Sequence, residues 1–72
     1  MKRLSELTPG ESALILEFSD ENLAVKLIEM GCLPGEKIKF EKVAPMGCPI
    51  IFSIGEHKLS MRRSEADKII VR

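Results

Sequence analysis

Residues 30 to 35 read Met-Gly-Cys-Leu-Pro-Gly, and this hexapeptide constrains the fold more than any other segment of the chain. Glycine has no Cβ and adopts a positive φ at little cost, so Gly31 is placed to end a helix with a left-handed cap. Pro34 and Gly35 suit the two central positions of a type II turn, because Pro fixes φ and Gly supplies the positive φ that follows. The hexapeptide therefore predicts a corner between a helix and a strand, with Leu33 as the apolar contact of the cap.

The residues on either side of this corner support the prediction. Before it, Leu23, Leu27 and Met30 recur at helical spacing, which predicts a helix over about residues 21–30 with Ser19-Asp20 as its N-cap. After the corner, polar and apolar residues alternate, as is typical of strands. In total the sequence predicts five short strands and, just before the last of them, a single helical turn. The strands are expected at residues 13–18, 36–40, 50–54, 57–62 and 69–71.

Five short strands and one helix in 72 residues leave few possible architectures. Exposed strand edges invite pairing with other chains, so strands this short are best protected in a closed or nearly closed barrel. A single helical turn before the last strand is typical of SH3-like barrels. We therefore expect a mainly β fold, a small SH3-like barrel in which residues 1–72 form one domain.

The charges and the missing aromatic residues exclude several classes of binding protein. Eleven basic and eleven acidic side chains give a net charge of zero, which argues against nucleic-acid binding because that function needs a cationic excess. The chain has no Trp and no Tyr, so it lacks an aromatic groove for proline-rich peptides and a platform for stacking bases. Positive charge is concentrated in residues 58–72, which hold five basic and two acidic side chains.

Membrane insertion and catalysis have no support in the sequence. No segment reaches the roughly 20 apolar residues that a membrane helix needs, and residues 1–6 lack the apolar core of a signal peptide. We therefore expect a soluble, cytoplasmic protein. None of the five glycines begins a nucleotide-binding loop, and the carboxylates are scattered, so the chain is not expected to be an enzyme.

Metal binding has only weak support. The candidate ligands are Cys32, Cys48 and His57, but a structural zinc site usually has four ligands, two of them closely spaced in the sequence. The two cysteines are 16 residues apart, and in a reducing cytosol we expect them to be free thiols. No cofactor is predicted.

Four motifs, taken in order, resemble the FeoA family of ferrous iron transport proteins. They read LSELTPGE at residues 4–11, LIEMGCLPG at 27–35, PMGCPI at 45–50 and MRRSEADKI at 61–69. The resemblance covers nearly the whole chain and implies an SH3-like barrel. It also implies a cytosolic, non-catalytic accessory protein that works with FeoB, the membrane ferrous iron transporter that bears a GTPase domain.

The surface expected to bind FeoB consists of a loop, the exposed side of the helix and two arginines. Loops on a rigid barrel are common binding sites. Arg62 and Arg63 are expected to face an acidic partner surface. The loop residues are Pro45, Met46, Gly47, Cys48 and Pro49.

Two alternatives stay open at this stage. One is a metal-responsive regulatory module related to the C-terminal domain of DtxR-type repressors, although the chain lacks the winged-helix DNA reader of those proteins. The other concerns assembly, because the sequence does not decide between a monomer and a homo-oligomer.

Overall fold

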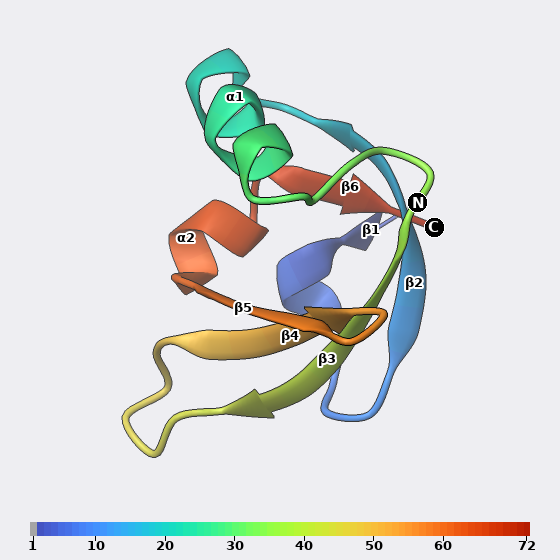
Figure 1. Cartoon of the computed structure of the whole chain (residues 1–72). Coiled ribbons are helices and arrows are strands. Elements are labelled where there is room, and N and C mark those ends of the chain that lie inside the picture. The colour runs from blue at the N-terminus through green and yellow to red at the C-terminus, as the bar shows by residue number, and fades with distance from the viewer. Residues whose placement is uncertain (1) are drawn as a thin grey trace.

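A strongly curved, six-stranded antiparallel sheet makes up most of the molecule (Figure 1). The structure is a computed structural model and describes residues 2–72. Its strands are β1 (Lys2–Arg3), β2 (Ser12–Phe18), β3 (Lys37–Val43), β4 (Ile50–Ile54), β5 (His57–Met61) and β6 (Ile69–Val71). Its helical elements are the 3-10 helix η1 (Leu4–Glu6) and the α-helices α1 (Glu21–Glu29) and α2 (Arg63–Ala66).

The strand order is β1-β6-β2-β3-β4-β5, and the sheet is not closed. The expected mainly β fold, with one longer helix and a helical turn before the last strand, is confirmed. The expected number of five strands was wrong, because β1 was missed. Lys2 and Arg3 pair with Val71 and Ile70 of β6. Two charged residues carry no alternating pattern, so only the tertiary pairing makes them a strand.

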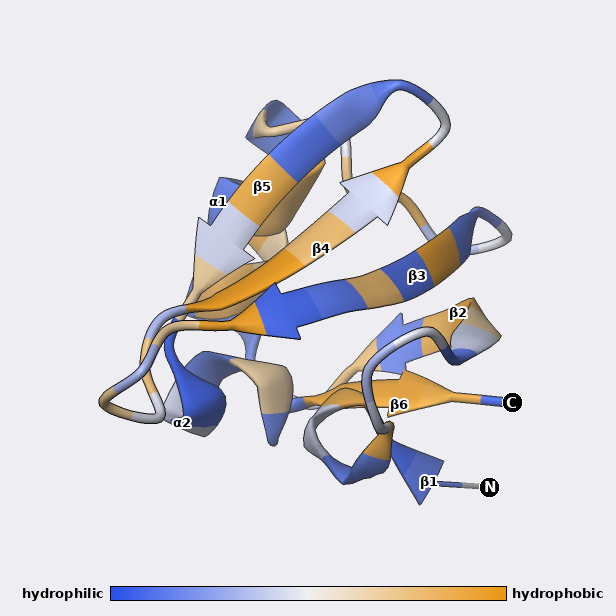
Figure 2. Cartoon of the chain, turned by 90° about the horizontal axis from the view of Figure 1, so that it is seen from below, coloured by the Kyte–Doolittle hydropathy of each residue, from blue (hydrophilic) through white to orange (hydrophobic). Residues whose placement is uncertain are grey.

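The core fills the inside of the curved sheet. In β3, Ile38 and Phe40 are buried while Lys37 and Lys39 are exposed, and Figure 2 shows this alternation along the strand. Phe40 packs edge to face on Phe52 of β4, with ring centroids 5.2 Å apart. The helical elements η1 and α2 contact each other. Both lie inside the curve of the sheet, where they complete the core (Figure 1).

The corner between α1 and β3 has the backbone geometry that the hexapeptide predicts. Gly31 has a φ of 87°, and its N–H donates to the carbonyl of Ile28 at 3.0 Å. The N–H of Cys32 donates to the carbonyl of Leu27 at 2.8 Å, which completes a Schellman cap. The N–H of Glu36 then donates to the carbonyl of Leu33 at 3.1 Å and closes the turn over Pro34 and Gly35.

The apolar contact of this cap is Cys32, and the prediction of Leu33 for this role was wrong. In a Schellman cap the apolar contact belongs to the residue that follows the left-handed glycine, and that residue is Cys32. Its side chain is fully buried, whereas Leu33 is 40% exposed. The helix ends at Glu29, one residue earlier than predicted, and Met30 is its C-cap.

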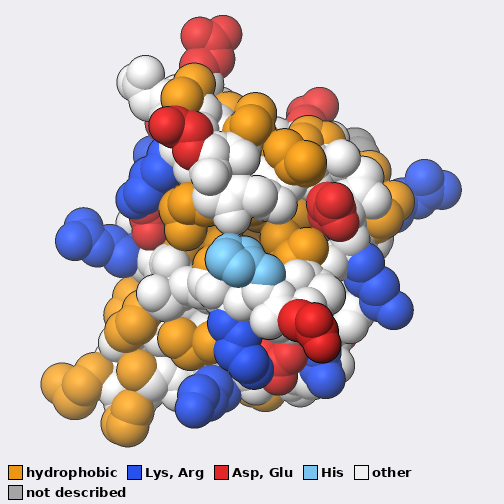
Figure 3. Space-filling model, viewed as in Figure 1, with side chains coloured by type: hydrophobic (Ala, Val, Ile, Leu, Met, Phe, Trp, Pro, Cys, Tyr) orange, Lys and Arg blue, Asp and Glu red, His pale blue; other side chains and the backbone are white. Residues whose placement is uncertain are grey.

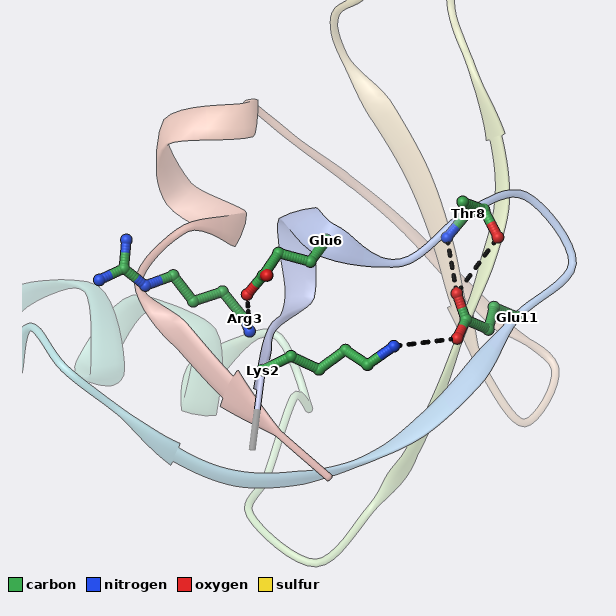
Figure 4. A network of polar contacts seen from close by, with 5 residues as sticks. All are labelled: Lys2, Arg3, Glu6, Thr8 and Glu11. Atoms are coloured by element: carbon green, nitrogen blue, oxygen red, sulfur yellow. Dashed lines mark hydrogen bonds and ion pairs between the residues drawn. The ribbon is translucent and has the colours of Figure 1, made fainter.

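Two glutamates hold the segment between β1 and β2 (Figure 4). Glu6 accepts a hydrogen bond from the N–H of Arg3 at 2.7 Å, at the start of η1. Glu11 accepts from the N–H and the hydroxyl of Thr8 at 2.9 and 3.2 Å, and it pairs with Lys2 at 3.2 Å. The Thr8 N–H first, and then Lys2, hold the pKa of Glu11 below its ordinary value of 4.5.

Candidate functional site

The loop that joins β3 to β4, residues 44–49, projects from one end of the molecule, and we call it the tip loop (Figure 1). The N–H of Ala44 donates to the carbonyl of Pro49 at 3.0 Å across its base. The N–H of Gly47 donates to the carbonyl of Ala44 at 2.8 Å, and Gly47 has a φ of 89°. These two bonds give the loop a defined shape even though its side chains have few neighbours.

The tip loop presents apolar side chains to solvent. Met46 is 92% exposed, and Pro45, Cys48 and Pro49 are exposed as well. Figure 3 shows the apolar side chains gathered at this end of the molecule, at the lower left. Burying a methionine side chain contributes about 1.5–3 kcal/mol. A cluster of exposed apolar residues on a braced loop is therefore a candidate docking surface.

The structure places Arg62 and Arg63 beside the tip loop. Ile50 at the start of β4 pairs with Met61 at the end of β5. The end of the tip loop, which precedes Ile50, therefore lies beside Arg62, which follows Met61. The N–H of Arg63 donates to Sγ of Cys48 at 3.4 Å, and the Arg63 guanidinium donates to the carbonyl of Ser5, also at 3.4 Å. Both arginines are exposed.

Lys42, which sequence reasoning missed, adds another cation to this end of the molecule. It is exposed and lies near the end of β3, beside the tip loop. The strand prediction stopped at residue 40, because the register between β3 and β4 shifts after Phe40 and breaks the alternation. A bulge inserts one extra residue and lets the strand continue beyond it. The break in alternation after Phe40 could therefore have been interpreted as a bulge, with Lys42 in the continuing strand.

The exposed side of α1, the other predicted contact element, is a separate surface at the opposite end from the tip loop (Figure 1). Val25 and Ile28 are 61% and 48% exposed there. Glu21 and Glu29 lie at the two ends of the helix, and its one basic residue, Lys26, is paired with Glu65, so the helix carries a net negative charge. The two predicted contact elements therefore differ in charge.

The three candidate metal ligands are not brought together. Cys32 is fully buried, and this burial raises the pKa of its thiol to about 11, so it stays protonated at neutral pH. Cys48 precedes β4 and His57 begins β5, so they lie at opposite ends of the β4–β5 hairpin, roughly 20 Å apart at about 3.3 Å per residue. Within residues 2–72, no three His, Cys, Asp or Glu side chains are grouped to hold a metal ion. Both cysteines are free thiols, as expected.

The helices of residues 2–72 include none with the length and hydropathy to cross a membrane. The longest of them, α1, has nine residues.

Comparison with known proteins decides the family. The family model of the FeoA domain matches residues 2–72, nearly the whole chain. The chain belongs to the FeoA family. A relative from Porphyromonas gingivalis, named Fe(2+) transport protein A/Fe(2+) transporter FeoB fusion protein, is 36% identical over 70 residues. That match covers 96% of this chain but only 8% of the fusion protein.

Solved structures of FeoA proteins share this fold. Iron(II) transport protein A from Clostridium thermocellum is 42% identical, with a TM-score of 0.87, and the match covers 97% of this FeoA chain and 44% of that one. The zinc complex of FeoA from Stenotrophomonas maltophilia, described as a prokaryotic SH3 domain protein, is 28% identical with a TM-score of 0.85. It covers 100% of this chain and 91% of that one, and it confirms the SH3-like fold. ScaR with bound Cd2+ has a TM-score of 0.85 at 15% identity, so that likeness concerns the fold alone.

Proposed function

We propose that this FeoA-family protein is a non-catalytic accessory protein of ferrous iron uptake that binds and modulates the transporter FeoB on its cytosolic side. The observation that carries this proposal is the Porphyromonas gingivalis relative, in which the homologous segment belongs to a fusion protein with FeoB. Domains joined in one chain meet at a high effective concentration, so a modest interface between them is occupied.

The tip loop with Arg62 and Arg63 is the proposed contact surface for FeoB. Met46 is exposed enough to enter an apolar hollow on a partner. The hydrogen bonds across the base of the loop reduce the entropy that is lost when the loop is ordered on binding. Arg62 and Arg63 beside the loop would meet carboxylates at the rim of the contact, where complementary charge mainly speeds association.

The direct test is a binding assay with full-length FeoB and with its isolated cytosolic portion, each without nucleotide, with GDP and with a GTP analogue. We expect the wild-type protein to bind at least one of these preparations. Met46→Ser should weaken that binding at least about tenfold, which corresponds to about 1.4 kcal/mol. Absence of binding to both preparations in every nucleotide state contradicts the proposed function.

The matched variant Val25→Ser separates the two candidate surfaces, because Val25 on α1 is also an exposed apolar residue. If the tip loop is the contact, Val25→Ser binds FeoB like the wild type. If Val25→Ser weakens binding and Met46→Ser does not, the contact lies on α1, and the assignment of the surface is wrong although the function holds.

A further inference from the structure

Four lysines of this protein have no carboxylate partner among residues 2–72, and they share one face of the sheet. The other three lysines each form an ion pair, Lys2 with Glu11, Lys26 with Glu65 and Lys68 with Asp20. All four unpaired lysines are exposed. They are Lys37, Lys39, Lys42 and Lys58, and we call the surface they form the lysine face.

The pairing of the strands places these lysines on the outside of the sheet. Lys37 and Lys39 alternate with the buried residues of β3 and therefore point outward. Lys39 lies opposite Ser53 of β4, and Ser53 lies opposite Lys58 of β5. With strands about 4.8 Å apart, the backbones of Lys39 and Lys58 are separated by about 10 Å, one on each side of Ser53.

Lys42 extends the lysine face toward the tip loop. Beyond the bulge in β3 it lies opposite Ile51, a residue that alternates with the buried Ile50 and Phe52 and so faces outward. Arg62, which directly follows β5, is exposed at the same end of the hairpin. The positive face therefore runs along β3 and β5 to the base of the tip loop. Figure 3 shows Lys and Arg side chains beside the apolar tip.

The carboxylates of Glu36 and Glu41 lie among these cations and offset two of the five positive charges that the four lysines and Arg62 carry. Glu41 accepts a hydrogen bond from the hydroxyl of Ser53 at 2.5 Å. That bond first, and then Lys39 and Lys58, lower the pKa of Glu41 from its ordinary value of 4.5, so it is ionised at neutral pH. Glu36 precedes β3 at the other end. Because the whole chain has a net charge of zero, a cationic excess here leaves the remaining surface negative and orients the protein in an electric field.

An open hollow lies beside the lysines. It has a volume of about 640 Å³ and lies between β2, β3 and β4. Lys37 and Lys39 line it together with Ser12, Ser53 and the carboxylates of Glu36 and Glu41. The Ser12 hydroxyl and the two ammonium groups can donate to a phosphate oxygen, whereas the Ser53 hydroxyl already donates to Glu41.

The composition of this face favours a lipid surface over a protein. Protein interfaces are enriched in aromatic residues and Arg and depleted in Lys. Here the exposed cations are four lysines along β3 and β5, and all three aromatic residues of the chain are Phe, of which Phe40 and Phe52 are buried. Lysines are flexible point charges that suit mobile phosphate headgroups, and juxtamembrane basic clusters are attracted to anionic leaflets.

We propose that the lysine face docks this protein on the anionic phospholipid headgroups of a membrane surface, with no segment inserted into the bilayer. This proposal goes beyond binding to FeoB, because the lipid itself is the ligand. Because Lys42 adjoins the tip loop, docking in this orientation brings that loop close to the membrane. There the loop can reach a membrane transporter.

The test is co-sedimentation of the purified protein with vesicles that contain no protein. One set of vesicles is phosphatidylcholine alone, and the other contains about one third phosphatidylglycerol as the anionic lipid. We expect binding to the anionic vesicles alone, with a steep loss between low salt and about 0.15 M salt, where the screening length is about 8 Å. Failure to bind anionic vesicles at low salt overturns the proposal and leaves the binding to FeoB untouched.

Two variant pairs and a matched control locate the binding face. Lys39→Gln with Lys58→Gln should weaken binding at least about tenfold, and Lys37→Gln with Lys42→Gln should do the same. The control, Lys26→Gln with Lys68→Gln, removes the same formal charge beside the helices and should bind like the wild type. Equal losses in the control and in the test pairs would show that only net charge matters and would overturn the proposal. Tighter binding to duplex DNA than to anionic vesicles at equal salt would also overturn it.

Discussion

At the scale of single residues, the two cysteines have opposite environments, although the sequence predicted both to be free thiols. Cys32 follows the left-handed Gly31 and is fully buried in the core, where it behaves as a small apolar side chain. Cys48 is exposed in the tip loop, where its sulfur accepts a hydrogen bond from the backbone of Arg63. Their chemistry should therefore differ sharply in the folded protein.

The first prediction concerns this difference in burial. Cys32→Ser should lower the free energy of unfolding by about 1–3 kcal/mol, because the hydroxyl is buried without a partner. Cys48→Ser should change it by less than about 0.5 kcal/mol, since the side chain is exposed. Urea denaturation of the two variants is the measurement. Equal stability of both would contradict the role of Cys32 in the cap.

A second prediction at this scale concerns reactivity. In native protein, a thiol reagent should modify Cys48 rapidly and Cys32 only after unfolding, because burial raises the pKa of Cys32 to about 11 and removes its thiolate at neutral pH. Mass spectrometry after a short labelling pulse identifies the modified residue. Rapid native labelling of Cys32 would mean that the cap opens frequently.

At the scale of elements, the sequence predicted what local backbone rules decide and missed what tertiary pairing decides. The end of α1 and the turn over Pro34 and Gly35 were predictable, because a positive φ at a glycine is a local requirement. β1 was missed because its two residues become a strand only through pairing with β6. The burial of Cys32 instead of Leu33 also follows from a local rule, because the residue after the left-handed glycine makes the apolar contact of a Schellman cap, and the prediction placed that contact one residue too late.

The third prediction tests the C-terminal cap of α1. Gly31→Ala should lower the free energy of unfolding by about 1–2 kcal/mol, the typical cost of left-handed backbone for a residue with a Cβ. A Cβ added at Gly31 would have no atom within 4 Å, so the cost comes from φ alone. Gly31→Asn should cost less, because Asn tolerates this region better. Equal effects of Ala and Asn in chemical denaturation would argue against a left-handed cap.

At the scale of the whole molecule, carboxylates join elements that are distant in the sequence. Asp20 caps α1 and pairs with Lys68 at 3.2 Å, next to β6. Glu65 accepts from the N–H of Arg62 and pairs with Lys26 of α1 at 2.9 Å. The sequence predicted the tip loop, the exposed side of α1 and the two arginines as contact elements, and the fold brings the tip loop and the arginines together but leaves α1 at the opposite end. The sequence could not predict the lysine face, because sequence alone does not show which lysines lack a partner.

The fourth prediction is a loss of stability in acid. The pKa values of Glu11, Asp20, Glu41 and Glu65 are all lowered, chiefly by hydrogen bonds from N–H groups or, for Glu41, from Ser53. A carboxyl group with a lowered pKa stabilises the fold above its unfolded pKa, and that stabilisation is lost as the pH falls through the folded pKa. The melting temperature should therefore drop as the pH falls from about 5 to about 3. In Glu65→Gln the melting temperature should fall less over this pH range, because one of the four carboxyl groups is gone. A wild-type melting temperature that does not change between pH 5 and pH 3 would contradict the prediction.

Titration of this FeoA-family protein against full-length FeoB shows whether the tip loop is the contact surface. The transporter should be held in discs of zwitterionic lipid, so that attraction to anionic headgroups does not contribute. We expect saturable binding that Met46→Ser weakens at least about tenfold. No saturable binding in any nucleotide state would contradict this expectation.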